Sequence, residues 1–267
     1  MVHLSIGTAG FFYKDWIGTF YPKQLEKGKY LEFFSRFFNI VEINSTFYNL
    51  PTKDMVINWN NSVPEEFRFI IKTWQQISHH IDAPDLDMNI FKFFSRLQEL
   101  KPKIACFLIQ FPPWFKYSES RLHKLEQLLE KIPSEYKYII ELRDNSWFDY
   151  QILSKFIDGE NFILGTTYMP EITPFYLPNQ KKYYVRMIGD RKLTIFNHIQ
   201  RDQNYAVKHL IKNIKNLINI PNISEIFIIV NNHFQGFGPK SANNLKQKFG
   251  LPYRTFRDQK SLTDFLY

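Results

Sequence analysis

A glutamate interrupts the apolar run at residues 40–46, IVEINST, which has the composition of a buried β-strand. Burying an unpaired carboxylate costs several kcal/mol, so Glu42 needs either a partner or a function. Asn44 follows two positions later, and side chains two apart in a strand share a face. A buried carboxylate beside an amide is typical of a general acid or base next to a group that orients a ligand.

Charged and amide side chains also gather near the ends of other β-rich runs. They are Lys72, Gln110, Glu141, Arg143, Arg186, Asn231, Asn232 and His233. Glu42 and Glu141 are therefore candidate acid–base residues, and Lys72 is the third catalytic candidate. Arginine forks match carboxylate and phosphate groups, which predicts that Arg143 and Arg186 bind an anionic substrate. The other candidate substrate-binding residues are Asn44, Asn232, His233, Trp147 and Tyr48.

The segments that would position these residues alternate between strand and helix. The β-rich runs lie at residues 3–10, 40–46, 67–74, 104–111, 138–144, 161–167, 183–189 and 226–233. Helical patterns lie at residues 25–37, 53–61, 87–100, 119–131, 149–157, 202–217 and 238–248. The connection at 168–180, YMPEITPFYLPNQ, has three prolines and no helical period. A loop is therefore predicted in place of the sixth helix.

This alternation predicts an α/β fold with a parallel sheet. Eight units in 267 residues predict a single (β/α)8 TIM-type barrel over residues 1–267. Such a barrel brings the C-terminal ends of all its strands to one mouth, where the active site forms. A doubly wound open sheet usually carries a Gly-rich turn after its first strand. The stretch GTAGFFYKDW and the lack of a GxGxxG motif disfavour that rival.

The composition predicts a cytoplasmic protein. The single cysteine, Cys106, lies in the apolar run IACFLI, which excludes a disulfide framework and fits a reducing compartment. The chain begins MVHLSIG without a charged-then-apolar leader, and its apolar runs are far shorter than the roughly 20 residues that span a bilayer. We expect no membrane partner. No GxxxxGK[ST], HExxH, GxSxG or CxxC motif occurs, and we expect no cofactor.

Positive charge is concentrated in one segment. The net charge is +8 at pH 7, and residues 181–220 hold nine Lys/Arg against two Asp/Glu. Such an excess can attract phosphates or nucleic acid. In the helical pattern at 202–217, however, Lys208, Lys212 and Lys215 lie opposite an apolar stripe. That arrangement is ordinary for an exposed helix face, and we favour this interpretation.

Six recognisable segments are spread from residue 6 to about residue 246. They are IGTAGFFYKDWIGTFYP, VEINSTFYNLP, FRFIIKTWQQISH, ELRDNSWF, YVRMIG and NNHFQGFGPKSANNL. They resemble the sequence blocks of the domain-of-unknown-function 72 family, also called YecE-like. The resemblance covers nearly the whole chain; it implies a TIM-type barrel and no particular reaction. Two positions depart from the family pattern: LGTTYMP lacks the carboxylate that commonly ends strand six, and Ile188 replaces the histidine of R-x-H-G.

The favoured function is an enzyme of hydrolase or lyase type that acts on a small anionic or sugar-phosphate-like substrate. A catalytic metal held by Glu42, Glu141 and His233 is disfavoured, because Lys72 and two arginines would repel a cation. A web of buried salt bridges, such as Glu42–Arg186 or Glu141–Lys72, would need no ligand. The alternative function is nucleic-acid binding by aromatic and basic residues at the mouth. The aromatic segments GFFYKDWIGTFYP, FYNLP, FPPWF and SWFDY would surround the mouth and can stack bases.

Overall fold

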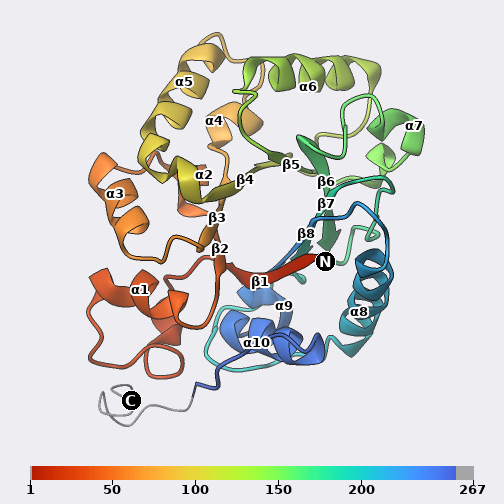
Figure 1. Ribbon diagram of the computed structural model, residues 1–267. Coiled ribbons are helices and arrows are strands. Elements are labelled where there is room, and N and C mark those ends of the chain that lie inside the picture. Colours follow the sequence, from red (N-terminus) through yellow and green to blue (C-terminus); the bar gives the residue numbers. More distant parts are fainter. Residues whose placement is uncertain (1, 257–267) are drawn as a thin grey trace.

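Eight parallel strands form a closed barrel in sequence order, as the computed structural model of residues 2–256 shows (Figure 1). They are β1 (His3–Ala9), β2 (Ile40–Ile43), β3 (Arg68–Lys72), β4 (Ile104–Gln110), β5 (Tyr138–Glu141), β6 (Phe162–Tyr168), β7 (Lys182–Met187) and β8 (Glu225–Val230). The sheet closes where β1 pairs with β8, with Thr8 opposite Val230. The predicted fold class is confirmed. The predicted domain covers 1–267, of which Met1 and residues 257–267 lie outside the described part.

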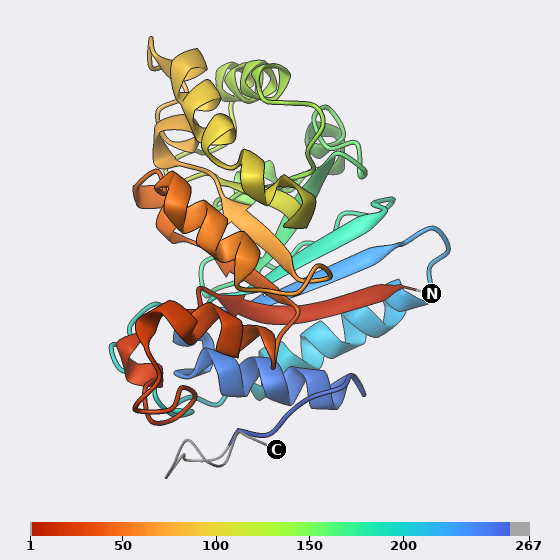
Figure 2. The same cartoon turned by 60° about the vertical axis from the view of Figure 1, so that its left-hand side comes forward.

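Helices surround the barrel on the outside (Figures 1 and 2). The longer ones are α1 (Tyr30–Ser35), α3 (Lys53–Asn61), α5 (Leu86–Arg96), α6 (Glu119–Lys131), α8 (Asn204–Ile218) and α10 (Gly238–Lys248). The short ones are α2 (Ser45–Tyr48), α4 (Gln75–Ser78), α7 (Tyr150–Leu153), α9 (Asn232–Gln235), η1 (Lys14–Trp16), η2 (Lys27–Lys29), η3 (Gln98–Lys103) and η4 (Asn145–Trp147). Residues 169–181, between β6 and β7, contain no helix, as the prolines predict.

Several strands end earlier than the sequence pattern predicts: β5, for example, ends at Glu141, and in β2 and β8 the structure shows the reason. The run 40–46 is a strand to Ile43, after which the Thr46 hydroxyl donates to the Ile43 and Lys72 carbonyl oxygens and helps the chain turn into α2. The run 226–233 is a strand to Val230, and Asn231 caps α9 by accepting from the His233 amide at 3.0 Å. Short polar side chains that bond to nearby backbone end both strands. Two predicted helices, 25–37 and 149–157, are also shorter.

The barrel interior changes from apolar to polar along the strands. Inward side chains in the middle of the barrel form an apolar cluster that includes Ile40, Ile70, Leu108, Ile139, Tyr184 and Ile229. Each strand is pleated, so the next inward position lies two residues further on. At that level the side chains are Glu42, Lys72, Gln110, Glu141, Arg186 and Asn231. The strand middles therefore seal the barrel, while the C-terminal ends carry the chemistry.

Three lysines of the basic segment 181–220 lie on the exposed face of α8. On α8, Lys208, Lys212 and Lys215 are exposed, whereas the opposite face packs on the barrel through residues such as Leu210 and Ile214. This is the amphipathic pattern of an ordinary surface helix. Within residues 2–256, no helix combines the length and the apolar character that crossing a membrane requires.

Candidate active site at the barrel mouth

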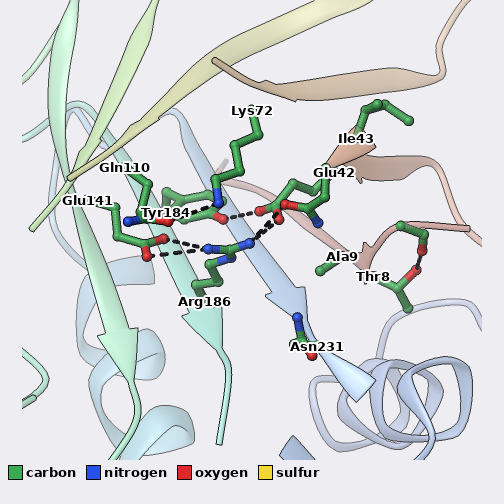
Figure 3. Close-up of polar contacts among 12 residues, drawn as sticks. Thr8, Ala9, Glu42, Ile43, Lys72, Gln110, Glu141, Tyr184, Arg186 and Asn231 are labelled. Carbon is green, nitrogen blue, oxygen red and sulfur yellow. Dashed lines mark hydrogen bonds and ion pairs between the residues drawn. The ribbon is translucent and has the colours of Figure 1, made fainter. Parts of the chain in front are cut away.

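Arg186 is the centre of a buried network at the C-terminal ends of the strands (Figure 3). It follows Tyr184 on the inward face of β7. Its Nη1 donates to Glu141 Oε2 at 3.0 Å, and its Nη2 donates to Glu42 Oε1 at 2.5 Å and to Asn44 Oδ1 at 3.1 Å. One guanidinium thus joins β2 and β5 across the lumen, and the two carboxylates share it as a partner.

Each carboxylate has a second partner. The Tyr184 hydroxyl donates to Glu42 Oε2, and Arg143 Nε donates to Glu141 Oε1 at 2.7 Å. Burial alone would raise the pKa of Glu141, but the positive charges of Arg186 and Arg143 outweigh burial and hold this pKa at about 2. Glu141 is therefore an anion near neutral pH, which suits holding cations in place better than accepting protons. The Glu42–Arg186 pair of the salt-bridge hypothesis is present, whereas Glu141 pairs with arginines.

Lys72 differs from the arginines because it has no carboxylate partner within the part of the chain that the structure describes. Its Nζ donates to Gln110 Oε1 at 2.9 Å and lies 3.9 Å from the centre of the Phe47 ring. Burial lowers the pKa of Lys72, the nearby Arg186 charge lowers it further, and the pKa falls to about 7. Lys72 can therefore gain or lose a proton at neutral pH, which a general acid or base requires.

Arg191, in the loop after β7, lies close to the network. The chain turns at Gly189 with φ +78°, where a Cβ atom would be 2.4 Å from the His233 carbonyl oxygen. Arg191 itself has φ +58°, a region that residues other than glycine rarely occupy. Partial burial, together with the charges of Arg143 and Arg186, lowers the pKa of Arg191. Its guanidinium has no hydrogen bond or ion pair within residues 2–256, so it is available to an anion.

Several buried polar atoms near the mouth lack a hydrogen-bond partner within the described residues. Two of them, Nε of Arg186 and Oγ1 of Thr167, belong to neighbouring strands. Thr167 pairs in register with Arg186 and is 2% exposed, whereas its neighbour Thr166 bonds to a loop carbonyl. Because side chains alternate along β6, Thr167 points inward. Buried polar atoms are nearly always hydrogen-bonded in native proteins, so these two mark a place where a polar molecule would be accommodated.

The remaining predicted residues lie around the network. Tyr48, at the end of α2, is 63% exposed, and its position near Tyr13 and Arg191 places it at the rim. Asn232 accepts from the Trp16 indole at 3.2 Å and from the Gly238 amide at 2.8 Å, which ties the first loop to α10. The exposed ring of Tyr48 is accessible to a ligand. The hydrogen bonds of Asn232 show that this residue also holds the structure together.

His233 and Trp147 lie in aromatic packing. The His233 ring meets the Phe196 ring edge to face at 4.9 Å, and burial lowers the pKa of His233. Trp147 is fully buried, stacks on Phe115 at 5.5 Å and donates to the Phe115 carbonyl at 2.6 Å. Both contacts hold the loops in place beneath the rim.

Two pockets lie next to the network. One shares a residue with it, and the other contains a residue near Lys72. The first, of about 470 Å³, contains Asn44 and Tyr13 and lies against α1 and α3. The second, of about 370 Å³, contains His79, His80 and Trp114. Burial and the nearby Lys72 charge lower the pKa of His79 to about 4, so this ring is neutral at pH 7. The first pocket therefore opens beside Asn44, and the second opens beside His79.

The donor set does not suit a metal ion. Glu42 and Glu141, the carboxylates that a metal at the mouth would need, already bind the Arg186 guanidinium. Within residues 2–256, no group of three or more His, Cys, Asp or Glu side chains could hold a metal. What the arrangement can do is bind an anion through cations and move a proton through Lys72.

The chain matches the family model described as "Protein of unknown function DUF72" over residues 5–264. The chain belongs to the DUF72 family. Two relatives carry the family-level name UPF0759. YecE of Escherichia coli (strain K12) is 33% identical over 129 residues, 48% of this chain and 47% of YecE, so the chain spans about half the length of this relative. YunF of Bacillus subtilis (strain 168) is 27% identical over 204 residues, 71% of each chain.

Solved DUF72 structures have the same fold. The DUF72 protein of Thermotoga maritima MSB8 gives a TM-score of 0.76 at 22% identity, covering 93% of this chain and 99% of that chain. The DUF72 protein of Enterococcus faecalis V583 gives 0.75 at 20% identity, covering 94% and 99%. At these identities the likeness establishes the barrel, and the chemistry must be argued from the residues of this chain.

Sequence reasoning on this DUF72 chain missed four residues of the mouth. They are Tyr13, Thr167, Tyr184 and Arg191. The sequence could have indicated Tyr184 and Thr167. Each lies in a strand, an even number of residues from another side chain that points into the barrel. Tyr13 and Arg191 lie in loops, where no periodicity indicates the direction of a side chain.

Proposed function

We propose that this DUF72 chain is a cytoplasmic enzyme that acts on a small anionic substrate at the C-terminal mouth of its barrel. Lys72 transfers the proton, Arg191 and Arg143 bind the anionic group, and Glu42 and Glu141 hold Arg186 and Arg143 in position. This assignment moves acid–base catalysis from the carboxylates, the first candidates in the sequence, to the lysine between them. Asn44 and Thr167 would orient polar groups of the substrate.

One observation carries the proposal: four cationic side chains meet two carboxylates in this layer. The cations are Lys72, Arg143, Arg186 and Arg191. Both carboxylates are bound by arginine, so a positive excess remains on Lys72 and Arg191. A surplus of cations in a partly desolvated place lowers the pKa of its own members, and a bound anion would relieve that repulsion. A phosphate or carboxylate group is the ligand that matches guanidinium geometry.

Thermal-shift titration with inorganic phosphate and with pyruvate tests the proposal. We expect both to stabilise the wild-type protein, and Arg191→Ala to weaken the apparent affinity at least about tenfold, because a charge-assisted hydrogen bond contributes about 1.5–3 kcal/mol. Lys192→Ala is the matched control, since it removes the same charge from the next residue of the loop. Equal weakening by both variants, or no stabilisation by either anion, would contradict the proposal.

Single-stranded nucleic acid is the second candidate ligand. Tyr48 at the rim is 63% exposed, and Trp114, in the adjoining pocket with Arg121 and Lys124, is 59% exposed. Exposed aromatic rings beside basic groups are suited to base stacking. Binding of a labelled single-stranded DNA, followed against salt concentration, tests this candidate. Nucleic-acid binding would be favoured over the enzyme by three results together. Binding would depend steeply on salt, Trp114→Ala and Tyr48→Ala would weaken it, and loss of Lys208, Lys212 and Lys215 would make the salt dependence less steep.

A further inference from the structure

Lys72 is buried without the usual means of stabilising an ammonium group. Gln110 is its hydrogen-bond partner, and the Gln110 amide is itself oriented, because Nε2 donates to the Phe111 carbonyl at 2.7 Å and turns Oε1 toward Lys72. Within residues 2–256, the carboxylates of Glu42 and Glu141 form their ion pairs with arginines. The amine therefore has one neutral acceptor, which also suits an uncharged –NH2 group.

The charges around Lys72 come from every side of the mouth. The charged groups that shift its pKa are Glu42 of β2, Glu141 of β5, Arg143 after β5 and Arg186 of β7. The Lys72 charge in turn lowers the pKa of His79, which follows α4. The carboxylates favour the ammonium form, and so does the Phe47 ring face. Burial and the arginines oppose it more strongly. About half of such amines are uncharged at pH 7, and the uncharged amine is a nucleophile.

We propose that Lys72 forms a covalent imine with a small anionic aldehyde or ketone bound at the mouth of the barrel. This inference rests on the proposed function, and it adds the carbonyl group to the substrate class. Arg191 and Arg143 would hold the carboxylate or phosphate of the substrate, and the carbonyl would face Nζ. An imine at this place draws electrons from the adjacent carbon, which is the chemistry of a lyase rather than a hydrolase.

The step balances without an oxidant or reductant. The lone pair of the neutral amine forms the C–N bond as the carbonyl π bond breaks, and one amine proton moves to the carbonyl oxygen, which gives a carbinolamine. A proton taken from solvent then converts the hydroxyl group into water, and the C–O bond breaks. The products are a protonated imine and one water molecule. Hydrolysis by the reverse route restores the free lysine.

Reductive trapping at pH 7 tests the imine directly. The full chain is incubated with glyoxylate or with dihydroxyacetone phosphate and with cyanoborohydride, and the modified lysines are located by peptide mass spectrometry. At pH 7 an amine with a pKa of about 7 is roughly half neutral, whereas an unperturbed lysine is about one part in a thousand neutral or less. We therefore expect Lys72 to be labelled at least about tenfold faster than any other lysine.

Lys103 is the matched internal control, because it is as buried as Lys72 but fully bonded. Lys72→Arg keeps the charge and should abolish the dominant adduct, Lys103→Arg should retain it, and Arg191→Ala should slow its formation about tenfold. Labelling of Lys72 that phosphate slows would support the inference.

The remaining outcomes separate the two proposals. If Lys72 stays unlabelled while glyoxylate stabilises the wild-type protein but not Arg191→Ala, the imine is wrong and anion binding stands. If there is neither an adduct nor stabilisation, both proposals are wrong. If exposed lysines are labelled as fast as Lys72, the imine is again contradicted, because its formation then needs no special site.

Discussion

Two lysines are buried at opposite ends of the barrel, one at the N-terminal end of the strands and one at the C-terminal end, and their surroundings differ. Lys103, just before β4, is 3% exposed, and its Nζ donates to the carbonyl oxygens of Asn60 and Val63 at 2.8 and 3.0 Å. It also lies 3.2 Å from Glu65 Oε1. Lys72, at the C-terminal end of β3, is 7% exposed and donates to one amide among arginines.

The difference shows that burial alone does not make a lysine reactive. At the N-terminal end, backbone carbonyls and a carboxylate satisfy the ammonium group, so Lys103 fastens the end of α3 to the start of β4. At the mouth, the carboxylates go to the arginines, and the lysine is left with a neutral partner and like charges. Fold stability explains the first arrangement, whereas the second costs stability and is typical of a functional site.

Removing the carboxylate that neutralises the mouth should have the largest effect on stability. In Glu141→Gln, Arg186 and Arg143 lose their shared anion while both stay buried. Breaking a buried ion pair by removing one partner costs about 3–5 kcal/mol. We expect a loss of this size in the free energy of unfolding, measured by urea denaturation at pH 7. A loss below about 1 kcal/mol would show that the network relaxes or takes up water, and would weaken its part in positioning the arginines.

Replacing each lysine by methionine compares the two ends directly. Lys103→Met leaves two buried carbonyl groups without a donor, which costs about 1–3 kcal/mol for each group left unsatisfied. Lys72→Met leaves one amide oxygen without a donor but removes a cation from among arginines, so we expect it to cost less than about 1 kcal/mol. Urea denaturation of both variants gives the comparison. An equal or larger loss for Lys72→Met would mean that Lys72 is a structural residue.

The sequence predicted the polar layer better than it predicted the connections within it. Strand periodicity placed Glu42, Lys72, Glu141 and Arg186 at one level. Whether a side chain points into the barrel depends only on its position within its own strand. Pairing is not local: whether Glu141 meets Lys72 or Arg186 depends on the stagger of strands 45 residues apart in the chain. Arg191 was missed because its position depends on the left-handed turn at Gly189, which packs against His233 and Phe234 of α9.

The pH dependence of stability should separate Lys72 from an ordinary lysine. Its pKa is lowered to about 7 in the folded protein, below the unfolded value of roughly 10.4. The cost of burying the charge is therefore fully present below pH 7. Between pH 7 and about 10, the unfolded chain binds more protons, so the wild-type protein should gain stability relative to Lys72→Met by about 1 kcal/mol per pH unit. Denaturation of both proteins at pH 6, 7.5 and 9 would show it, and parallel curves would contradict the lowered pKa.

The smallest effect is expected at the carboxylate of the N-terminal end. Glu65 lies within ion-pair distance of Lys103, yet its side chain is 85% exposed, so water competes for it. The two backbone carbonyls remain bonded to Lys103 when this carboxylate is neutralised. Glu65→Gln should therefore cost less than about 0.5 kcal/mol in urea denaturation, as exposed ion pairs usually do. If Glu65→Gln cost as much as Lys103→Met, Lys103 would depend on this exposed carboxylate rather than on the two carbonyl groups, and its description as a buried amine satisfied by backbone would be wrong.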